Sequence, residues 1–485
     1  MVEEFDPPKK AGEPQPNTSD ELIASDQLGL SELAPVDLYQ KREKIYTRKI
    51  EGFFQRLRTL TGWPLLLGYF LLPWFSLEGR QAILFDLPER KFHIFWMTFW
   101  PQDFPLLAWL LIIAAFALFA ITNFAGRVWC GYTCPQTVWT AIYMWMEQVT
   151  EGNRNQRIKL DKASISGEKL LRKSIKHLMW GGFAFLTGFT FIGYFVPVQQ
   201  LLPNFFSGQA YIAAYAWILF FTLATYINAA YMREQVCKYM CPYARFQSAM
   251  FDRDTLIVSY DEARGEPRGS RRRDADYKAQ GKGDCIDCEL CVQVCPTGID
   301  IRNGLQYECI TCALCIDACN SVMDKMDYPR GLIRYTTAKN LAGGKTSLFR
   351  PKMIGYSLMM LIMCSLFVYT LGTRIPLRVD IIRDRGDLFE LQDGLVTNVY
   401  EVRVLNLSDE PQTYQLQATG LEGLRILGNQ FLNVEGGEAL TLPVRLVVPQ
   451  SDILSPIEEI SIRVTSEGQP GLVVEEESRF IAPTN

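Results

Sequence analysis

Two stretches of the sequence repeat one spacing of cysteines: residues 285–296 are CIDCELCVQVCP and residues 309–320 are CITCALCIDACN. Each stretch has three cysteines at intervals of three residues and a fourth cysteine four residues further on. Bacterial proteins that bind two [4Fe–4S] clusters have this spacing, and in them the fourth cysteine of each run ligates the cluster held by the other run. We therefore predict two clusters, one on Cys285, Cys288, Cys291 and Cys319 and the other on Cys295, Cys309, Cys312 and Cys315.

Zinc is the alternative occupant of these cysteines, because pairs of the form CxxC also bind zinc. The doubled register of eight cysteines, together with Pro296, favours iron–sulfur clusters. Asn320 stands where the first stretch has proline, a departure that removes no ligand. Apolar residues between the cysteines are expected to shield the clusters from water; they are Ile286, Val292, Ile310 and Ile316.

A second cysteine motif, CxxxCP, lies upstream and occurs twice. Each copy follows an apolar run that ends in an asparagine and an arginine, which indicates a duplicated unit. The first copy has Asn123, Arg127, Cys130, Cys134 and Pro135, and the second has Asn228, Arg233, Cys237, Cys241 and Pro242. Cysteines four residues apart lie on one side of an α-helix, so each pair is predicted to act as a two-thiol ligand.

These four cysteines are the candidate catalytic and metal-binding residues, and three interpretations of them stay open. Thiolates favour the soft ion Cu(I), so the two pairs could bind and reduce copper. They could equally hold a further iron–sulfur cluster, or they could be buried structural cysteines. The thirteenth cysteine, Cys364, lies in an apolar run and is expected to fill space there.

The sequence around the CxxxCP motifs is apolar enough to cross a membrane several times. Residues 104–124 carry no charge over 21 positions, and a helix of about 20 apolar residues spans the hydrocarbon core. Similar runs occupy residues 60–77, 178–198, 210–232 and 353–372. With tryptophan and tyrosine near their ends, these runs predict five membrane spans.

Lysine and arginine set the expected orientation. Residues 1–59 hold nine of them and residues 125–177 another nine, whereas residues 376–485 hold no lysine and eighteen Asp and Glu. By the positive-inside rule, the N-terminus and residues 243–350 should face the cytoplasm of a bacterium, and the part after the last span should face the periplasm. The expected location is therefore the cell inner membrane.

The expected fold is a multi-domain membrane protein. A disordered leader (residues 1–50) precedes an α-helical region of four spans with both CxxxCP motifs (51–242). An α+β, two-cluster ferredoxin-like domain (243–350) comes next, before the last transmembrane helix (353–372). Alternating strands separated by glycine, proline and Asn/Asp turns predict an all-β immunoglobulin-like sandwich of about seven strands over residues 376–485.

Composition excludes several functions. The chain has only two histidines, His93 and His177, so polyhistidine metal sites cannot form. No nucleotide-binding GxGxxG accompanies the cysteines, so electrons must come from a partner or from the quinol pool. His93 could contact a quinone. The basic stretch 264–282 is expected to face solvent or lipid headgroups and not nucleic acid.

Taken together, these features resemble the FixG-like cytochrome c oxidase accessory proteins, members of the membrane polyferredoxin group. The resemblance covers about residues 50–485, and its most specific element is the order of two CxxxCP motifs, a ferredoxin motif, a last span and a sandwich. Segments that carry it include WCGYTCPQTVW (129–139), EGNRNQRIKLD (151–161) and CKYMCPYARFQ (237–247).

This resemblance implies an oxidoreductase that reduces Cu(II) to Cu(I) during assembly of cbb3-type cytochrome c oxidase and depends on the CxxxCP cysteines. Its expected partners are copper chaperones or assembly factors of that oxidase; the electron donor and a homo-oligomeric state are left open. Two alternatives remain. One is a quinol-linked electron-transfer subunit for another reductase, and the other is a non-enzymatic redox sensor or assembly scaffold.

Overall fold

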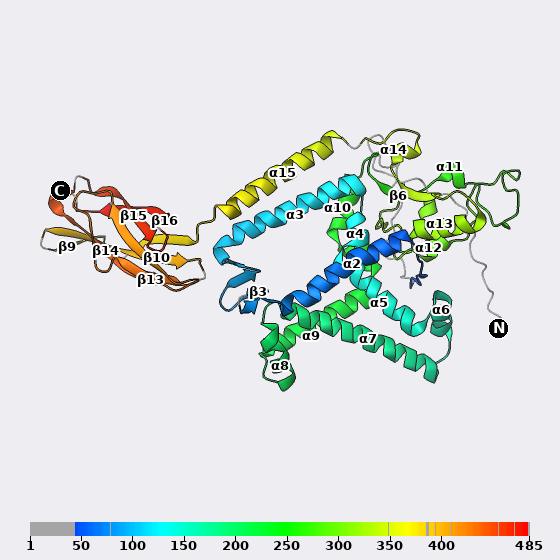
Figure 1. The fold of residues 1–485 in the computed structure, drawn as a ribbon, viewed down its shortest axis with the longest axis horizontal. Helices are drawn as coiled ribbons and strands as arrows, with labels where there is room; N and C mark the ends of the chain where they lie inside the picture. Colours follow the sequence, from blue (N-terminus) through cyan, green and yellow to red (C-terminus); the bar gives the residue numbers. More distant parts are fainter. Residues whose placement is uncertain are drawn as a thin grey trace, which may run out of the picture. The chain divides into compact units, whose positions relative to one another are not determined.

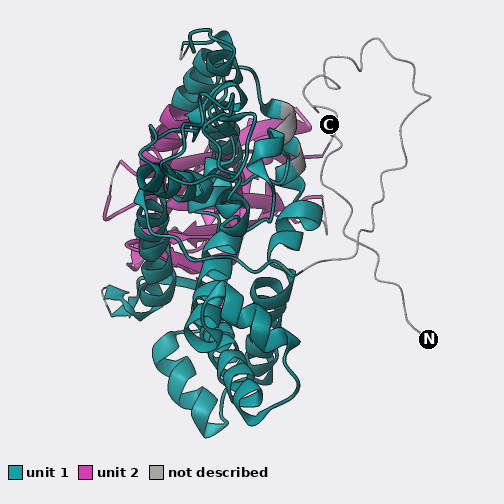
Figure 2. Ribbon diagram, turned by 90° about the vertical axis from the view of Figure 1, so that its right-hand side faces the viewer, with its two compact units in different colours: residues 1–85, 110–363 teal, residues 86–109, 364–485 magenta. Residues whose placement is uncertain are grey.

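The computed structural model describes residues 44–485 except 78, 348, 385–387, 393, 409, 454, 470 and 484–485. Most of the predicted leader, up to residue 43, lies outside the described residues. The chain forms two compact units, one of residues 1–85 and 110–363 and the other of residues 86–109 and 364–485 (Figure 2). The predicted boundary between residues 242 and 243 falls inside the first unit.

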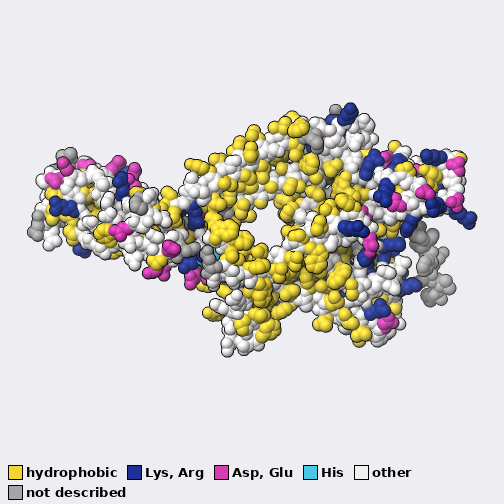
Figure 3. Space-filling view, viewed as in Figure 1, with side chains coloured by type: hydrophobic (Ala, Val, Ile, Leu, Met, Phe, Trp, Pro, Cys, Tyr) yellow, Lys and Arg dark blue, Asp and Glu magenta, His cyan; other side chains and the backbone are white. Residues whose placement is uncertain are grey.

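Three helices of the described chain are long and apolar enough to cross a membrane: Pro101–Ala125, Ile212–Met232 and Pro351–Gly372. They contain α3 (Phe104–Ala125), α9 (Ile212–Tyr226) with η3 (Ile227–Met232), and α15 (Pro351–Gly372). Large apolar side chains cover their surfaces (yellow in Figure 3), and Leu111 and Leu361 are 62% and 64% exposed. Such surfaces suit lipid, so the chain is membrane-associated.

The other two predicted spans coincide with helices that are less uniformly apolar. Residues 60–77 overlap α2 (Phe53–Leu71), which contains Pro64 and, in its first turns, Arg56 and Arg58. Residues 178–198 overlap α7 (Gly167–Ile192), whose first half carries several lysines and arginines. Helix α7 packs along α9 and α5 (Pro135–Glu151) in the first unit (Figure 1). The count of five spans stays a prediction.

The ferredoxin-like part is closed by a pair of strands on either side of the cysteine stretches. Strand β6 (Ile257–Tyr260) pairs antiparallel with β7 (Ile333–Thr336). Between them lie α11 (Glu262–Gly265), α12 (Leu290–Gln293), η5 (Ile301–Asn303) and α13 (Leu314–Met326). The α12 helix packs against α13, so the two cysteine stretches are brought together.

Asn320 explains why the two stretches differ in helix length. Proline cannot continue a helix, and α12 ends at Gln293, before Cys295 and Pro296. In the second stretch, asparagine in the place of that proline allows α13 to run on through Cys319 to Met326. The Asn320 side chain accepts a hydrogen bond from the Gly331 backbone at 3.1 Å, which ties α13 to the chain that leads into β7.

The second unit contains a β-sandwich, as predicted, with nine described strands in place of about seven. One sheet has the order β12-β14-β10-β8 with β9 beside β10, and the other has the order β13-β11-β15-β16. The strands are β8 (Leu377–Arg383), β9 (Glu390–Gln392), β10 (Leu395–Asn406), β11 (Gln412–Thr419), β12 (Arg425–Leu427), β13 (Phe431–Val434), β14 (Ala439–Pro449), β15 (Ile457–Ser466) and β16 (Val473–Ile481). Alternate side chains, such as Val402 and Val404 of β10, are fully buried in the core between the sheets.

Residues 86–109 belong to the second unit because they pack on this sandwich. Strand β4 (Lys91–Ile94) pairs antiparallel with β5 (Met97–Phe99), so the stretch around His93 forms a hairpin. The ring of Trp100 lies so close to Gly437 that a Cβ there would be 2.7 Å from it. Arg374 forms an ion pair with Asp103 at 2.5 Å, which joins the two segments of the unit.

Shorter elements complete the described chain. They are η1 (Leu72–Trp74), β1 (Ser76–Leu77), β2 (Arg80–Gln81), β3 (Ile83–Asp86), η2 (Pro101–Asp103), α4 (Val128–Tyr132), α6 (Arg154–Lys162), α8 (Val198–Ser207), η4 (Val236–Met240), α10 (Pro242–Met250), α14 (Ala338–Leu341) and η6 (Gln450–Asp452).

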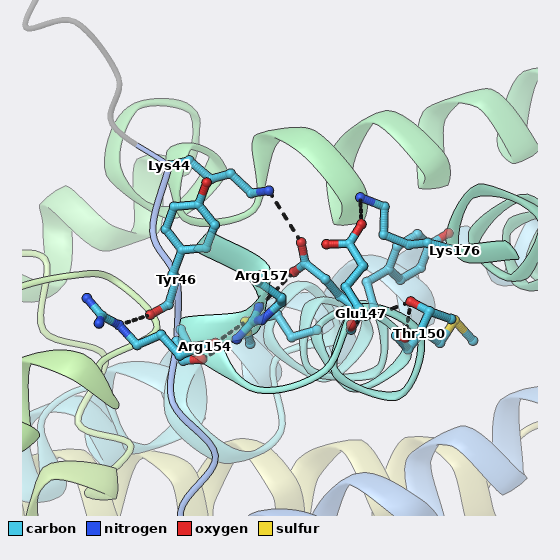
Figure 4. A network of polar contacts seen from close by, with 12 residues as sticks. Lys44, Tyr46, Glu147, Thr150, Arg154, Arg157 and Lys176 are labelled. Atoms are coloured by element: carbon cyan, nitrogen blue, oxygen red, sulfur yellow. Dashed lines mark hydrogen bonds and ion pairs between the residues drawn. The ribbon is translucent and has the colours of Figure 1, made fainter. Parts of the chain in front are cut away.

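A buried charge network holds the helices of the first unit together (Figure 4). Glu147 of α5 is fully buried and accepts hydrogen bonds from Arg157 at 3.2 Å and from Arg233 at 3.1 Å. One turn later, Glu151 is also fully buried and pairs with Lys176 of α7 at 2.7 Å. Buried charges of this kind are tolerated only when they are paired. The network therefore fixes how α5, α6, α7 and the residue after η3 meet.

The first described residues, 44–50, form a segment without regular secondary structure, called the strap below. The strap binds to the helices that carry this network. Arg154 donates a hydrogen bond to the Tyr46 carbonyl at 2.9 Å, and Arg157 donates one to the Thr47 carbonyl. Asp161 accepts hydrogen bonds from the Lys44 ammonium at 2.6 Å and from the Tyr46 hydroxyl at 2.7 Å. The segment EGNRNQRIKLD, which carried part of the resemblance, thus anchors the strap.

The strap continues to the cysteine stretches and to the first helix. The Arg48 backbone donates to the Gln293 carbonyl at 2.8 Å. Asp317, which lies between Cys315 and Cys319, accepts hydrogen bonds from the backbone of Phe54 at 3.2 Å and Gln55 at 2.8 Å. These amides belong to the first turn of α2, where a carboxylate stabilises the helix dipole.

Replacement of Asp161 by asparagine should destabilise the first unit by about 2 kcal/mol at pH 7, the value typical of hydrogen bonds to a charged group. Burial alone would raise the pKa of Asp161, but hydrogen bonds from Lys173, Lys44 and Tyr46 outweigh it and hold that pKa well below its usual range. A carboxylate with a lowered pKa stabilises the fold above its unfolded-state pKa of about 3.9 and loses this effect as the pH falls. Thermal unfolding of wild type and D161N should therefore differ at pH 7; the difference should begin to shrink below about pH 4 and disappear only as the pH falls through the lowered native-state pKa.

The matched control is D324N, because Asp324 pairs with Arg330 at 2.6 Å on an exposed surface. Exposed ion pairs contribute little to stability. Equal losses in D161N and D324N would contradict the assigned role of the buried network.

Candidate metal centre

The first predicted ligand set surrounds one cavity. Its four cysteines, Cys285, Cys288, Cys291 and Cys319, all line this cavity. The other lining side chains are mostly apolar and include Leu290, Val322, Met323, Leu332 and Ile333. Cys285 and Cys291 are buried, whereas Cys288 is exposed. This cavity therefore has an edge that solvent can reach.

The second predicted ligand set surrounds a neighbouring cavity. Cys295 comes from the first stretch and Cys309, Cys312 and Cys315 come from the second, as the spacing predicts for a shared pair of sites. Val258, Ile299, Ile301 and Ile310 complete the lining. Cys291 lines both cavities, so the two cavities adjoin.

The backbone of the two stretches is shaped in the same way around these cavities. Asp287 and Glu289 both have φ of 54°, and the equivalent residues Thr311 and Ala313 have φ of 53° and 61°. Residues other than glycine adopt this left-handed conformation rarely, and they keep it where the surroundings require it. Its repetition at matching positions curls each stretch around the space between its own cysteines.

The chemistry of the lining suits an iron–sulfur cluster. Burial raises the pKa of the Cys309 and Cys319 thiols to about 12. At neutral pH these thiols would keep their protons unless a metal replaced them, since metal ligation requires the thiolate. Four thiols around one apolar space are the donor set that a cubane cluster needs. Among the described residues, no three Cys, His, Asp or Glu side chains lie close enough to hold a single metal ion.

The prediction that each CxxxCP pair lies on one α-helix is wrong. Cys130 lies in α4, but Cys134 is outside it, in an extended conformation with ψ of 127°. Cys237 lies in η4, and Cys241 follows it with ψ of 110°. The cause is the proline that follows each second cysteine. A residue before proline avoids the helical conformation, and the proline itself starts the next helix, α5 or α10.

The two CxxxCP repeats have the same order of residues, as predicted, but the second repeat contains additional residues. From Asn123 to Arg127 there are four positions, and from Asn228 to Arg233 there are five. The extra residue is absorbed by a π-helix at Ile227–Met232, in which the Arg233 amide bonds to the Asn228 carbonyl five residues back. One more residue is added between Arg233 and Cys237 than between Arg127 and Cys130, whereas the two cysteine pairs have the same spacing. Cys134 and Cys241 each donate to a carbonyl five residues back, that of Trp129 and that of Val236.

The four CxxxCP thiols lie in one neighbourhood. Burial raises the pKa of Cys130 to about 12 and that of Cys237 to about 11, and the charge of Cys134 adds to both. Cys241 also acts on both of these thiols. Cys130 further contacts the buried Gln247 of α10, with Sγ 3.5 Å from Oε1. The duplicated units thus bring the candidate cysteines together.

The first CxxxCP motif directly contacts the second cluster-binding stretch. A Cβ on Gly131 would lie 2.7 Å from the Ile310 carbonyl oxygen and 2.9 Å from the Cys312 Cα. Cys130 packs against the apolar group that contains Ile310 and Cys312. The Tyr335 hydroxyl donates to the Thr311 carbonyl at 2.5 Å, inside the same stretch. The CxxxCP site and the second cavity therefore share a wall.

Arg127 connects the first CxxxCP motif to the second cluster-binding stretch and to α10. The sequence predicted only its place in the repeat, not these contacts. Its backbone amide donates to the Thr311 hydroxyl at 3.1 Å, and its guanidinium donates to the carbonyls of Tyr307 and Ala244. Burial lowers the pKa of Arg127, and the opposing influence comes from Cys130, Cys309, Cys237 and Cys241. The recurrence of an arginine before each CxxxCP motif is the sequence signal that pointed to it.

The remaining candidate residues lie elsewhere. Cys364 is exposed on α15. In the second unit, the His93 ring lies 3.1 Å from the Thr98 hydroxyl of the same hairpin, and its quinone role stays a prediction. His177 of α7 lies 2.7 Å from the Tyr226 hydroxyl.

Three family models match parts of the chain. A model described as a 4Fe-4S dicluster domain covers residues 232–338, and one described as a 4Fe-4S binding domain covers residues 107–149. A third, described as an IG-like fold at the C-terminal of FixG, covers residues 367–483. The second model includes Cys130 and Cys134 but none of the eight ferredoxin-type cysteines.

Curated relatives match almost the whole length. The nitrogen fixation protein FixG of Rhizobium meliloti is 37% identical over 88% of this chain and 90% of its own. Protein RdxA of Cereibacter sphaeroides is 37% identical over 89% of this chain and 96% of its own. A crystal structure of a FixG-related protein from Vibrio parahaemolyticus covers 22% of this chain and 95% of that one, at 36% identity and a TM-score of 0.21.

Replacement of Gly131 by alanine should separate the first CxxxCP unit from the second cluster-binding stretch. The added methyl group meets backbone atoms that cannot rotate away, so a cost of about 1–3 kcal/mol is expected, as for other overpacked sites. Iron and sulfide per purified chain should fall, together with the melting temperature.

The control is G182A in α7, where an added Cβ meets nothing within 4 Å. Full cluster content and unchanged melting in G131A would show that the two segments do not depend on this contact.

Proposed function

The chain belongs to the FixG family of membrane-associated iron–sulfur proteins, and from this premise we propose that it reduces Cu(II) to Cu(I) for the assembly of cbb3-type cytochrome c oxidase. The reaction adds one electron to the copper ion and transfers no atom. Bound [4Fe–4S] clusters supply one-electron chemistry of this kind. The ferredoxin-type cysteines are the residues that would hold them.

The observation that carries the proposal is the shared wall between Cys130 and the second cluster cavity. A thiol that receives copper must lie close to the electron source, and Cys130 packs against the group that contains Cys312. The backbone of Gly131 closes the remaining space, because even one added carbon would overlap Ile310 and Cys312. Water is thereby excluded from the contact, which lowers the energy needed to rearrange solvent around a moving charge.

The four CxxxCP thiols are suited to the product of the reaction. Thiolates prefer soft Cu(I) to Cu(II), so a thiol pair stabilises copper after it has gained the electron. Gln247, which is fully buried, approaches the Cys130 sulfur and orients it. Cys288 gives the first cavity an exposed edge at which an electron donor could act. Copper chaperones or oxidase assembly factors would take the Cu(I) from the thiols.

A second candidate function has an observation of its own. The family model described as a 4Fe-4S binding domain covers Cys130 and Cys134, which favours a further iron–sulfur cluster on the CxxxCP thiols. The chain would then pass electrons, for example from quinol, to another reductase. Metal analysis with EPR of the reduced protein separates these cases, because copper reduction needs iron for two clusters and the alternative needs iron for three.

Replacement of Cys130, Cys134, Cys237 and Cys241 together by serine should lower copper reduction at least about tenfold, because loss of even the groups that orient metal ligands costs about 10–100-fold. Purified protein, reduced without oxygen and freed of reductant, is mixed with Cu(II), and Cu(I) is measured with a coloured chelator. Iron content should remain that of two clusters.

The control is C364S, whose cysteine is exposed on α15 and should leave the rate unchanged. Undiminished reduction by the fourfold variant would remove these cysteines from the proposed reaction. Loss of iron equal to one cluster in the fourfold variant would favour the second candidate.

A further inference from the structure

We propose that Arg127 is the counter-charge of the CxxxCP metal site and makes that site prefer Cu(I) to divalent ions. This inference rests on the proposed copper function and assigns to Arg127 the choice of oxidation state. The arginine is not a metal ligand, and it acts through its fixed positive charge.

The first argument is the environment of the guanidinium. Arg127 is only 3% exposed, and a buried charge is costly unless an opposite charge compensates it. Its hydrogen bonds go to the neutral carbonyls of Tyr307 and Ala244. No carboxylate of the described residues forms an ion pair with it. The Ala244 carbonyl lies one turn of α10 before Gln247, whose side chain touches the Cys130 sulfur, so the guanidinium is held near the CxxxCP thiols. Once a metal has displaced their protons, the negative charge of these thiolates would offset the cost of burying the guanidinium.

The second argument is a comparison within the molecule. Arg233 holds the corresponding position of the second repeat, but the π-helix that precedes it turns its side chain elsewhere. Its guanidinium pairs with the buried carboxylate of Glu147 at 3.1 Å and bonds to the Ala230 carbonyl at 2.8 Å. One arginine of the duplicated pair is thus neutralised by an acid, and the other bonds to backbone carbonyls and has no carboxylate partner among the described residues.

The third argument is the charge balance of metal binding. When a pair of thiols binds Cu(I), both protons leave, and the complex carries one net negative charge. When the same pair binds a divalent ion, the complex is neutral. A cation held near such a pair therefore stabilises the Cu(I) complex more than the divalent one. At the effective dielectric constant of about 20 that applies near buried sites, such a charge changes affinity by roughly tenfold or more.

The test uses purified, cluster-containing protein in which Cys237 and Cys241 are replaced by serine, so that only the pair Cys130 and Cys134 binds the metal, and all variants below are made in this background. Affinity for Cu(I) and for Zn(II) is measured by competition with a coloured chelator under anaerobic conditions. R127Q should bind Cu(I) about tenfold more weakly and should lose less affinity for Zn(II), since only the Cu(I) complex is anionic. R127K keeps the charge and should stay close to the background protein. R233Q, the matched control from the other repeat, should leave the ratio of the two affinities unchanged.

A second variant serves if R127Q does not retain its clusters. Q247E places a carboxylate beside the Cys130 sulfur, one turn of α10 after the Ala244 carbonyl that Arg127 binds, and leaves the bonds from the guanidinium to the backbone in place. The added negative charge opposes the positive charge of Arg127 at the site. The ratio of Cu(I) to Zn(II) affinity in Q247E should fall as in R127Q. An unchanged ratio in both variants, or equal losses for both metals with no rescue by R127K, would overturn the role of Arg127.

The same measurements separate this inference from the proposed function. The fourfold cysteine variant should lose the Cu(I) affinity that wild type shows. If it binds Cu(I) as wild type does, the proposed copper site is wrong. If it loses Cu(I) while R127Q does not, the copper site stands and only the inference about Arg127 fails.

Discussion

The close approach of the Gly131 backbone to Ile310 and Cys312 is the contact on which the arrangement of the first compact unit depends. It leaves no room for a side chain, and it lies where a duplicated membrane hairpin meets a loop that curls around a metal cavity. Both partners are made rigid by chemistry specific to each: the hairpin by the proline after Cys134, and the loop by left-handed residues between its cysteines. Neither segment can move without disturbing the other.

Inserted residues make the two halves of the duplication unequal. If both CxxxCP repeats had the spacing of the first, Arg127 and Arg233 would be expected to take equivalent positions relative to the cysteines. The π-helix at Ile227–Met232, directly before Arg233, rotates the residues that come after it, because it adds one residue to a helical turn. Arg233 consequently reaches Glu147 and helps to hold α5 and α6, whereas Arg127 remains beside the thiols. One repeat thus contributes a structural ion pair and the other contributes charge to the site.

The sequence predicted the parts of the site that depend on local spacing and missed those that depend on distant contacts. Cysteine intervals alone assign Cys295 to the cavity of the second stretch, and the structure places it there. The helical interpretation of CxxxCP failed because it ignored the effect of proline on the preceding residue. The partners of Arg127 could not be predicted, because they are backbone carbonyls more than a hundred residues away, and backbone groups carry no mark in a sequence.

The first compact unit also shows why helix α2 and the cluster-binding residues belong together. Asp317 lies on α13 between two predicted cluster ligands, yet its carboxylate bonds to the first amides of α2. Eight thiols around two apolar cavities are a weak core without metal, since metal–thiolate bonds supply much of the folding energy of small metal-binding domains. The position of α13, and through Asp317 the start of α2, therefore depends on the same cysteines that carry the chemistry. Folding of the helical region and loading of the clusters are coupled through one carboxylate.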